Sequence, residues 1–129
     1  MLHRSKASIV FLFLLTLVPM AFAVGCGEKA PAVDPAVVAA GQQHFGATCA
    51  TCHGKDANGL PKQGKSLLMN PYIIDKSDDD LVLFIKTGRP SSDPLNTTGV
   101  DMPPKGGNPA LGDDDVKAIV AYLRTLQKL

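Results

Sequence analysis

The feature that most constrains this chain is a pair of cysteines followed directly by a histidine, in the Cys-Ala-Thr-Cys-His stretch at residues 49–53. Two cysteines at this spacing with an adjoining histidine are typical of the attachment site of a c-type haem. The two thiols lie on one turn of backbone, so each of them can add to one vinyl group of the same porphyrin. His53 is then left beneath the ring, with an imidazole nitrogen within reach of the iron. The motif therefore predicts one covalent haem c, attached through Cys49 and Cys52, with His53 as an axial ligand.

Other chemistries of the cysteine pair explain less of the stretch. A structural zinc site needs four protein ligands, and Cys26 is the single further cysteine, while the spacing of His44 does not favour a site. A thioredoxin-like redox pair is expected beside a βαβ pattern, which this sequence does not contain. A disulfide between Cys49 and Cys52 would be strained and would have no use for His53. We therefore adopt haem attachment as the interpretation.

The first 25 residues predict a secretory signal peptide. A basic start is followed by an apolar stretch over residues 7–18 and by a small-residue site, Ala-Phe-Ala, at residues 21–23. This order is typical of export signals. Export agrees with the haem, because thioether attachment takes place outside the cytoplasm. We expect an exported protein on the periplasmic side of a bacterial membrane.

Cys26 has an explanation of its own. The stretch Ala-Val-Gly-Cys at residues 23–26 resembles a bacterial lipobox, in which the cysteine is lipidated and becomes the first residue of the mature chain. The first position departs from the leucine that lipoboxes prefer. Cleavage after Ala23 would instead give a soluble protein, and retention would give a membrane-spanning helix, since residues 7–27 carry no charge. We predict a lipidated Cys26, a tether over residues 26–35 and a haem domain over residues 36–129.

The haem domain is predicted to be all-α. A helix is expected to begin near Pro35, a suitable first-turn residue, with Val37, Gly41 and Phe45 on one face. A second helix is expected after Ser77, whose side chain can cap it, and a last one from near Asp113. Residues 54–64 and 89–109 are rich in turn-forming residues and predict loops. No run alternates convincingly enough to be a strand.

Met102 is the predicted sixth ligand of the iron. It lies in an Asp-Met-Pro-Pro stretch at residues 101–104, in a loop outside any apolar stripe, so the usual core-filling role of methionine suits it poorly. A thioether is a soft, neutral ligand, and His/Met ligation raises the reduction potential of a haem. Met69 is the competing methionine, and we expect it to line the haem pocket instead.

With these residues in place, the chain from about Pro35 to Leu129 resembles a class I, mitochondrial-type cytochrome c. It is similar in particular to the single-haem subunits that serve bacterial respiratory complexes. The resemblance implies a small all-α fold of three to five helices wrapped around one covalent haem. It also implies that the first and last helices cross at Gly41, with Phe45 and Tyr122 packed around the crossing.

The resemblance raises two further points about the haem surroundings. Members of the family often carry a proline after the haem loop, whose carbonyl accepts a hydrogen bond from the haem histidine. Lys65 stands in that place here, so either the Lys65 carbonyl or Pro61 could serve. Arg89 corresponds to a loop arginine that reaches a haem propionate in relatives, and a plain surface role is the alternative.

The predicted function is one-electron transfer between respiratory or photosynthetic redox partners, by cycling of the haem iron between Fe(II) and Fe(III). No substrate turnover is expected, because both axial positions are filled and no catalytic constellation is present. A haem-based sensor or peroxidase-like domain, with a displaceable sixth ligand, is the alternative. We expect redox proteins as partners, a membrane respiratory complex among them, and no nucleic acid. His44 is expected on the solvated surface. Four lysines are candidates for a docking face: Lys55, Lys62, Lys65 and Lys105.

Overall fold

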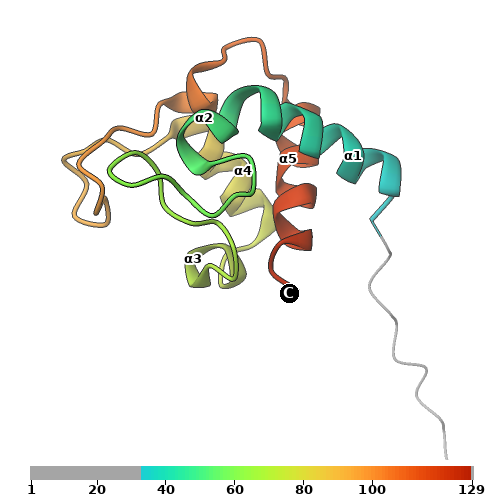
Figure 1. Ribbon diagram of the computed structural model, residues 1–129. Coiled ribbons are helices and arrows are strands. Elements are labelled where there is room, and N and C mark those ends of the chain that lie inside the picture. The colour runs from blue at the N-terminus through green and yellow to red at the C-terminus, as the bar shows by residue number, and fades with distance from the viewer. Residues whose placement is uncertain (1–32, 129) are drawn as a thin grey trace, which may run out of the picture. The chain divides into compact units, whose positions relative to one another are not determined.

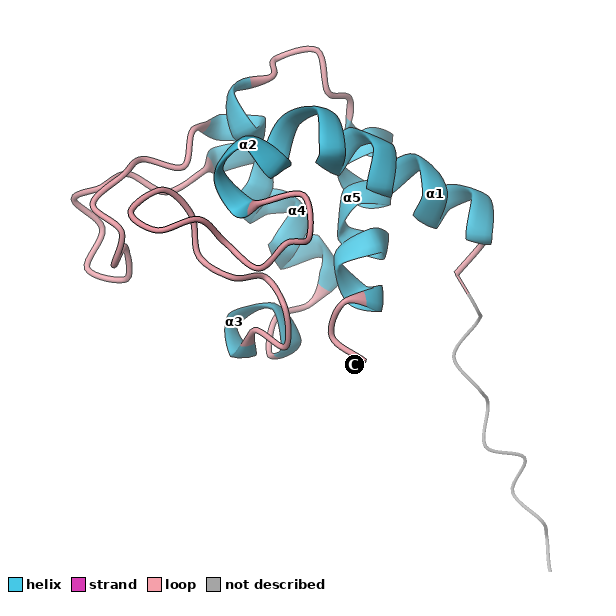
Figure 2. Cartoon of the chain, viewed as in Figure 1, coloured by secondary structure: helices cyan, strands magenta, loops and turns pink. Residues whose placement is uncertain are grey.

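The computed structural model describes residues 33–128. The predicted signal peptide, Cys26 and most of the tether therefore lie outside the described residues. Within residues 33–128 the chain is helical and contains no strand (Figure 2). Two isolated β-bridges, Leu60 with Gly64 and Arg89 with Met102, are the only sheet-like pairings in this part of the chain. The all-α expectation is confirmed.

The first helical run carries the cysteine–histidine motif at its C-terminal end. It consists of α1 (Pro35–His44), a π-helical turn (Phe45–Cys49) and α2 (Ala50–His53). The three pieces follow one another without a break, because the residues at both junctions keep right-handed helical backbone angles. The Asp34 carboxylate caps α1 by accepting from the Ala36 N–H at 2.8 Å. Gly54, with a φ of 76°, ends the run.

Three further α-helices complete the domain: α3 (Pro71–Ile74), α4 (Asp78–Thr87) and α5 (Asp113–Thr125). The predicted starts of α4 and α5 are confirmed. Ser77 caps α4 through its hydroxyl, which accepts from the Asp80 N–H at 3.2 Å. The short α3 and a 3₁₀ turn (Pro104–Gly107) lie in segments that the sequence analysis assigned no helix.

α1 and α5 cross at Gly41, as the resemblance implied (Figure 1). A Cβ atom at Gly41 would lie only 1.9 Å from the carbonyl oxygen of Ala118, so the two backbones touch. The rings of Phe45 and Tyr122 pack beside the crossing, with 5.4 Å between their centroids. Val37, expected on the same face, is 40% exposed, and its neighbour Val38 packs against the core instead.

Candidate haem-binding site

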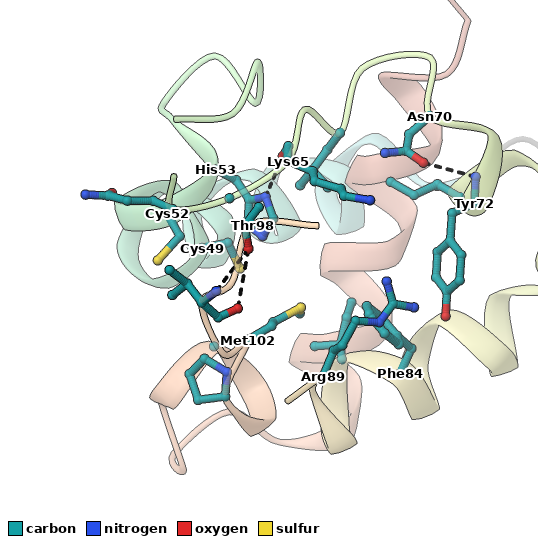
Figure 3. A pocket seen from close by; sticks show the side chains of 18 of the residues that line it. Cys49, Cys52, His53, Lys65, Asn70, Tyr72, Phe84, Arg89, Thr98 and Met102 are labelled. Carbon is teal, nitrogen blue, oxygen red and sulfur yellow. Dashed lines mark hydrogen bonds between the residues drawn. The ribbon is translucent and has the colours of Figure 1, made fainter. Parts of the chain in front are cut away.

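A cavity of about 400 Å³ lies beside the end of the first helical run (Figure 3). Its volume falls within the range of roughly 300–1,000 Å³ that is usual for ligand and cofactor pockets. The loops after α2 and α4 close it on the sides, and Cys49, Cys52, His53 and Met102 all contribute to its lining. Its walls are mostly apolar and include Phe45, Ile73, Leu81, Ile85, Ile119 and Leu123. Helices and loops both line the cavity, and the loops supply most of its polar groups.

His53 is held by a backbone carbonyl of the following loop. Its ring Nδ1 lies 2.8 Å from the carbonyl oxygen of Lys65, and only a protonated Nδ1 can donate to that oxygen. Nε2 is then the unprotonated nitrogen that can bind a metal. Such a bond also fixes the orientation of the ring and raises its donor strength. Of the two acceptors that the sequence left open, the structure has the Lys65 carbonyl rather than Pro61.

Gly64 explains how the loop comes so close to the motif. A Cβ at Gly64 would lie 2.5 Å from the carbonyl oxygen of Cys52 and 3.1 Å from Nδ1 of His53. Only a residue without a side chain fits there, so Gly64 lets the Lys65 carbonyl reach the imidazole.

Met102 approaches the cavity from the side opposite His53 (Figure 3). Its backbone exchanges two hydrogen bonds of 2.8 Å with Arg89, which join the two ends of the long loop. Met69, by contrast, is 50% exposed and does not line the cavity. The expectation that Met69 lines the pocket is therefore wrong; its backbone turns through a positive φ of 43°, and the side chain faces solvent. Within residues 33–128, Met102 is the methionine available to the cavity.

Arg89 lies in the cavity rather than on the surface, since its side chain is only 14% exposed. The guanidinium carbon lies 4.8 Å from the ring centroids of both Tyr72 and Phe84, which are 5.1 Å from each other, so the cation packs against a pair of contacting aromatic rings. Its Nε is 3.4 Å from the Asp93 carboxylate but is buried and makes no hydrogen bond. A buried donor without a partner, inside an apolar cavity, fits an anionic group of a bound molecule.

The residues around the cavity fit a haem c. Two thiols, an imidazole, a facing thioether and a guanidinium whose Nε makes no hydrogen bond surround an apolar space. Burial, and to a smaller extent the neighbouring Cys52, raises the pKa of the Cys49 thiol to about 11, so the unattached thiol stays protonated at neutral pH. Among residues 33–128 no three His, Cys, Asp or Glu side chains cluster closely enough to hold a metal ion, which leaves the zinc alternative without support there.

A small helical domain that presents such a cavity beside a Cys-x-x-Cys-His turn has the architecture of a single-haem c-type cytochrome. The chain matches the family model for cytochrome c over residues 38–127. It belongs to the cytochrome c family, whose members bind haem c covalently and transfer electrons.

Curated relatives come from two groups of bacteria. The chain is 32% identical over 94 residues to a "Cbb3-type cytochrome c oxidase subunit CcoP" of Rhodobacter capsulatus, an alignment that covers 72% of this chain and 30% of the relative. It is 36% identical over 85 residues to "Cytochrome c-555" of Chlorobaculum thiosulfatiphilum, covering 66% of this chain and 91% of the relative. The chain thus spans less than a third of the CcoP relative's length. No solved structure matches the chain.

Two surface residues make contacts within the fold. His44 lies at the surface as expected, with its side chain 36% exposed, and its Nε2 lies 3.2 Å from the Asp115 carboxylate in the first turn of α5. The Lys105 ammonium donates to the Leu111 carbonyl at 2.6 Å, so this lysine is engaged within the fold. In the described part of the chain, no helix has the length and apolar character needed to cross a membrane.

The aromatic pair beside Arg89 and the hydrogen bonds that Asn96 makes within its loop were not predicted from the sequence. Tyr72 and Phe84 stand in different helices, and no short-range pattern connects either of them to Arg89. A local signal for Asn96 was present in the sequence, since asparagine before a Thr-Thr-Gly stretch favours a turn in which its side chain hydrogen-bonds the following backbone.

Proposed function

We propose that this cytochrome carries one haem c attached through Cys49 and Cys52, with His53 and Met102 as the axial ligands of the iron. The observation that carries the proposal is the hydrogen bond from His53 Nδ1 to the Lys65 carbonyl, which leaves Nε2 for the metal. When bound, the haem supplies a one-electron Fe(II)/Fe(III) couple. The protein orients the imidazole, holds the thioether opposite and surrounds the group with apolar side chains that limit access of water.

Arg89 is the residue that we assign to a haem propionate. The proposal rests on its buried Nε and on the two rings that hold the guanidinium in the cavity. A carboxylate there would complete the hydrogen bonding of the arginine, which a buried charged group requires. Replacing Arg89 with Gln should keep the covalent haem and change its reduction potential; an unchanged potential would count against this assignment.

Extraction and spectroscopy test the haem and its ligands. Denatured protein should keep its haem through acid–acetone extraction and give the pyridine haemochrome spectrum of a c-type centre. The oxidised protein should show the weak near-infrared band of sulfur bound to ferric haem, and the reduced protein should bind carbon monoxide poorly. Met102→Ala should remove the band, open the sixth position and lower the potential. Met69→Ala is the matched control, because Met69 faces solvent, and it should leave the band intact.

The opposite result would assign the protein to another class. A wild-type protein that lacks the band and binds carbon monoxide readily has an open sixth position. That outcome would favour the haem-based sensor or peroxidase-like alternative over a pure electron carrier.

We further propose that the electrons pass between redox proteins outside the cytoplasm, with a membrane respiratory complex as one partner. The similarity to an oxidase subunit supports a respiratory setting for this chain, and the similarity to a cytochrome c-555 supports a small separate carrier. Affinity capture from solubilised membranes distinguishes the two. Recovery of oxidase subunits in fixed ratio would favour a subunit, and recovery of the cytochrome alone would favour a mobile carrier.

Three of the four predicted docking lysines remain candidates for the docking face. Lys55, Lys62 and Lys65 are exposed on the loop that follows the haem motif, whereas Lys105 is bonded within the fold. A basic face of this kind would steer an acidic partner, and association should slow as salt is added.

Charge reversal tests this face. Lys62→Glu together with Lys65→Glu should slow electron transfer to the partner at low ionic strength. Asp79→Lys with Asp114→Lys reverses two exposed charges on α4 and α5 and should have a smaller effect. Equal effects of the two pairs would remove the case for the lysine face.

For the N-terminal region we propose a signal peptide over residues 1–25, a lipidated Cys26 and a tether over residues 26–35. Cys26 lies shortly after the apolar stretch and the small-residue site, and an odd cysteine in an exported protein calls for a cause. Several acyl chains anchor a protein stably in a membrane, whereas a single chain binds only marginally. A tethered haem domain would meet membrane-bound partners at high effective concentration.

Mass spectrometry of the mature N-terminus decides among the three alternatives for this region. A lipidated Cys26 supports the tether, and Cys26→Ser should then block processing at that site. Val24 as the first residue would indicate a soluble carrier. An intact N-terminus beginning at Met1 would indicate a transmembrane anchor.

A further inference from the structure

The segment between Arg89 and Met102 is a closed loop that delivers the methionine to the cavity (orange, at the left of Figure 1). Its two ends are joined by the paired backbone hydrogen bonds between Arg89 and Met102. One step inward, the Ser91 N–H donates to the carboxylate of Asp101. Loops of 6–16 residues with adjacent ends commonly owe their shape to their own side chains.

Asn96 is the side chain that holds the middle of this loop. Its amide nitrogen donates to the carbonyl oxygens of Val100, at 2.8 Å, and Pro90, at 3.2 Å. Its amide oxygen accepts from the backbone N–H groups of Thr98 and Gly99, each at 3.0 Å. One amide thus connects the loop segment that leaves α4 to the loop segment that runs into Met102.

The chemistry of these bonds requires an amide. A carboxamide has two N–H donors and an oxygen with two lone pairs, and all four are used here. Aspartate could still accept from the two N–H groups, but it would place a negative oxygen against two carbonyl oxygens. Alanine would make none of the bonds. No neutral residue of similar size replaces both functions.

Asn96 also lines the cavity, together with Thr97 and Thr98. Its amide has no hydrogen-bonding capacity left for a bound haem, because the loop takes all of it. We therefore expect Asn96 to act on the haem through the loop rather than through a hydrogen bond of its own. The Val100 carbonyl that it holds lies two residues before Met102, so the anchor is close to the ligand.

We propose that Asn96 is a positioning residue for the sixth ligand, whose amide keeps the loop closed and Met102 directed into the cavity. The inference rests on the proposed role of Met102 as that ligand. Without the amide, the loop opens more often and the sixth position becomes accessible to added ligands. The fold of the helices does not depend on Asn96, since all of its side-chain bonds stay within residues 90–100.

Imidazole binding to the oxidised holoprotein tests the proposal. Imidazole must displace Met102, so its apparent affinity rises in proportion to the fraction of open loop. Asn96→Ala and Asn96→Asp should each raise that affinity roughly tenfold, the effect of about one net hydrogen bond. Both should also lose the near-infrared sulfur band at a lower imidazole concentration than wild type. Asn58→Asp is the matched control, because Asn58 is exposed on another loop and its side chain makes no hydrogen bond.

The outcomes separate this proposal from the ligand assignment. A wild-type protein without the band refutes Met102 as the ligand. A band in wild type, with unchanged imidazole affinity in both Asn96 variants, refutes the positioning role alone. An effect of Asn96→Asp without one of Asn96→Ala would assign the change to added charge and overturn the proposal. So would a parallel loss of far-UV circular dichroism, since Asn96 would then support the whole domain.

Discussion

Gly41 marks the point where α1 and α5 touch, and Gly41→Ala is the substitution most informative about the fold. The new Cβ would lie 1.9 Å from the carbonyl oxygen of Ala118 and 2.4 Å from its carbonyl carbon. Both neighbours are helix backbone and cannot rotate away as a side chain would. Ordinary contact begins near 3.4 Å, so the helices must separate locally by about 1.5 Å.

The expected loss of stability follows from this displacement. Overpacking of a core costs about 1–3 kcal/mol, and the upper part of that range applies because the obstacle is backbone. Separating two packed groups by about 0.5–1 Å already removes a quarter to a half of the dispersion attraction between them. The nearby Phe45–Tyr122 contact would therefore lose part of its dispersion attraction as well. Alanine returns about 1 kcal/mol through its higher helix propensity. The net decrease in the free energy of unfolding is therefore about 2 kcal/mol.

Gly46→Ala is the matched control, because a Cβ at Gly46 meets no atom within 4 Å. It should be neutral or stabilising by up to about 1 kcal/mol. Urea unfolding of the holoprotein, followed by far-UV circular dichroism, measures both variants. For a domain of this size, the decrease at Gly41 corresponds to a fall in Tm of about 8–16 °C. Equal stabilities of the two variants would refute the argument that the helix crossing requires glycine.

Three more predictions follow from particular contacts. Arg124→Gln should lower the free energy of unfolding, measured by urea titration, by about 2 kcal/mol, because the guanidinium donates to Asp78 at 2.7 Å and to the carbonyls of Ile73 and Lys76. Lys117→Gln is the control: it breaks only an exposed ion pair and should change the free energy of unfolding by less than about 0.5 kcal/mol. The hydrogen bond and charge of Lys86 hold the pKa of Asp113 below its usual value. The pair therefore stabilises the fold above the unfolded-state pKa of about 3.9, and this contribution is lost as pH falls through the lower folded-state pKa. Asp113→Asn should flatten the decline of Tm measured between pH 5 and 2, and an unchanged slope would contradict the pairing. Lys65→Ala should shift the reduction potential less than Gly64→Ala in a potentiometric titration, because His53 bonds the backbone carbonyl of Lys65, which Gly64→Ala would push away.

Much of the fold could be predicted because its signals are local. The positions of Ser77 and Asp113 predicted the starts of α4 and α5, since capping and helix-dipole effects act within one turn of the chain. The cysteine–histidine motif predicted the chemistry of the cavity for the same reason, as its three groups lie within five residues. The crossing at Gly41 came from resemblance to a family, and the structure agrees with it.

The partners that meet across the cavity could not be predicted in this way. His53 bonds a carbonyl twelve residues further along the chain, and the choice between Lys65 and Pro61 depends on how the intervening loop turns. Met69 was expected in the pocket because its neighbours are apolar. Its own backbone takes a positive φ, however, and its side chain faces solvent.

Arg89 gives the physical reason most clearly. Its sequence neighbours, Gly88 and Pro90, indicate only a loop, and a charged side chain in a loop is ordinarily exposed. Its burial depends on two rings from α3 and α4 and on the backbone of Met102, thirteen residues away. The sequence by itself determined which groups could bind a haem and where the helices begin. Tertiary structure decided which of those groups face one another, because loop closure brings together residues that share no local pattern.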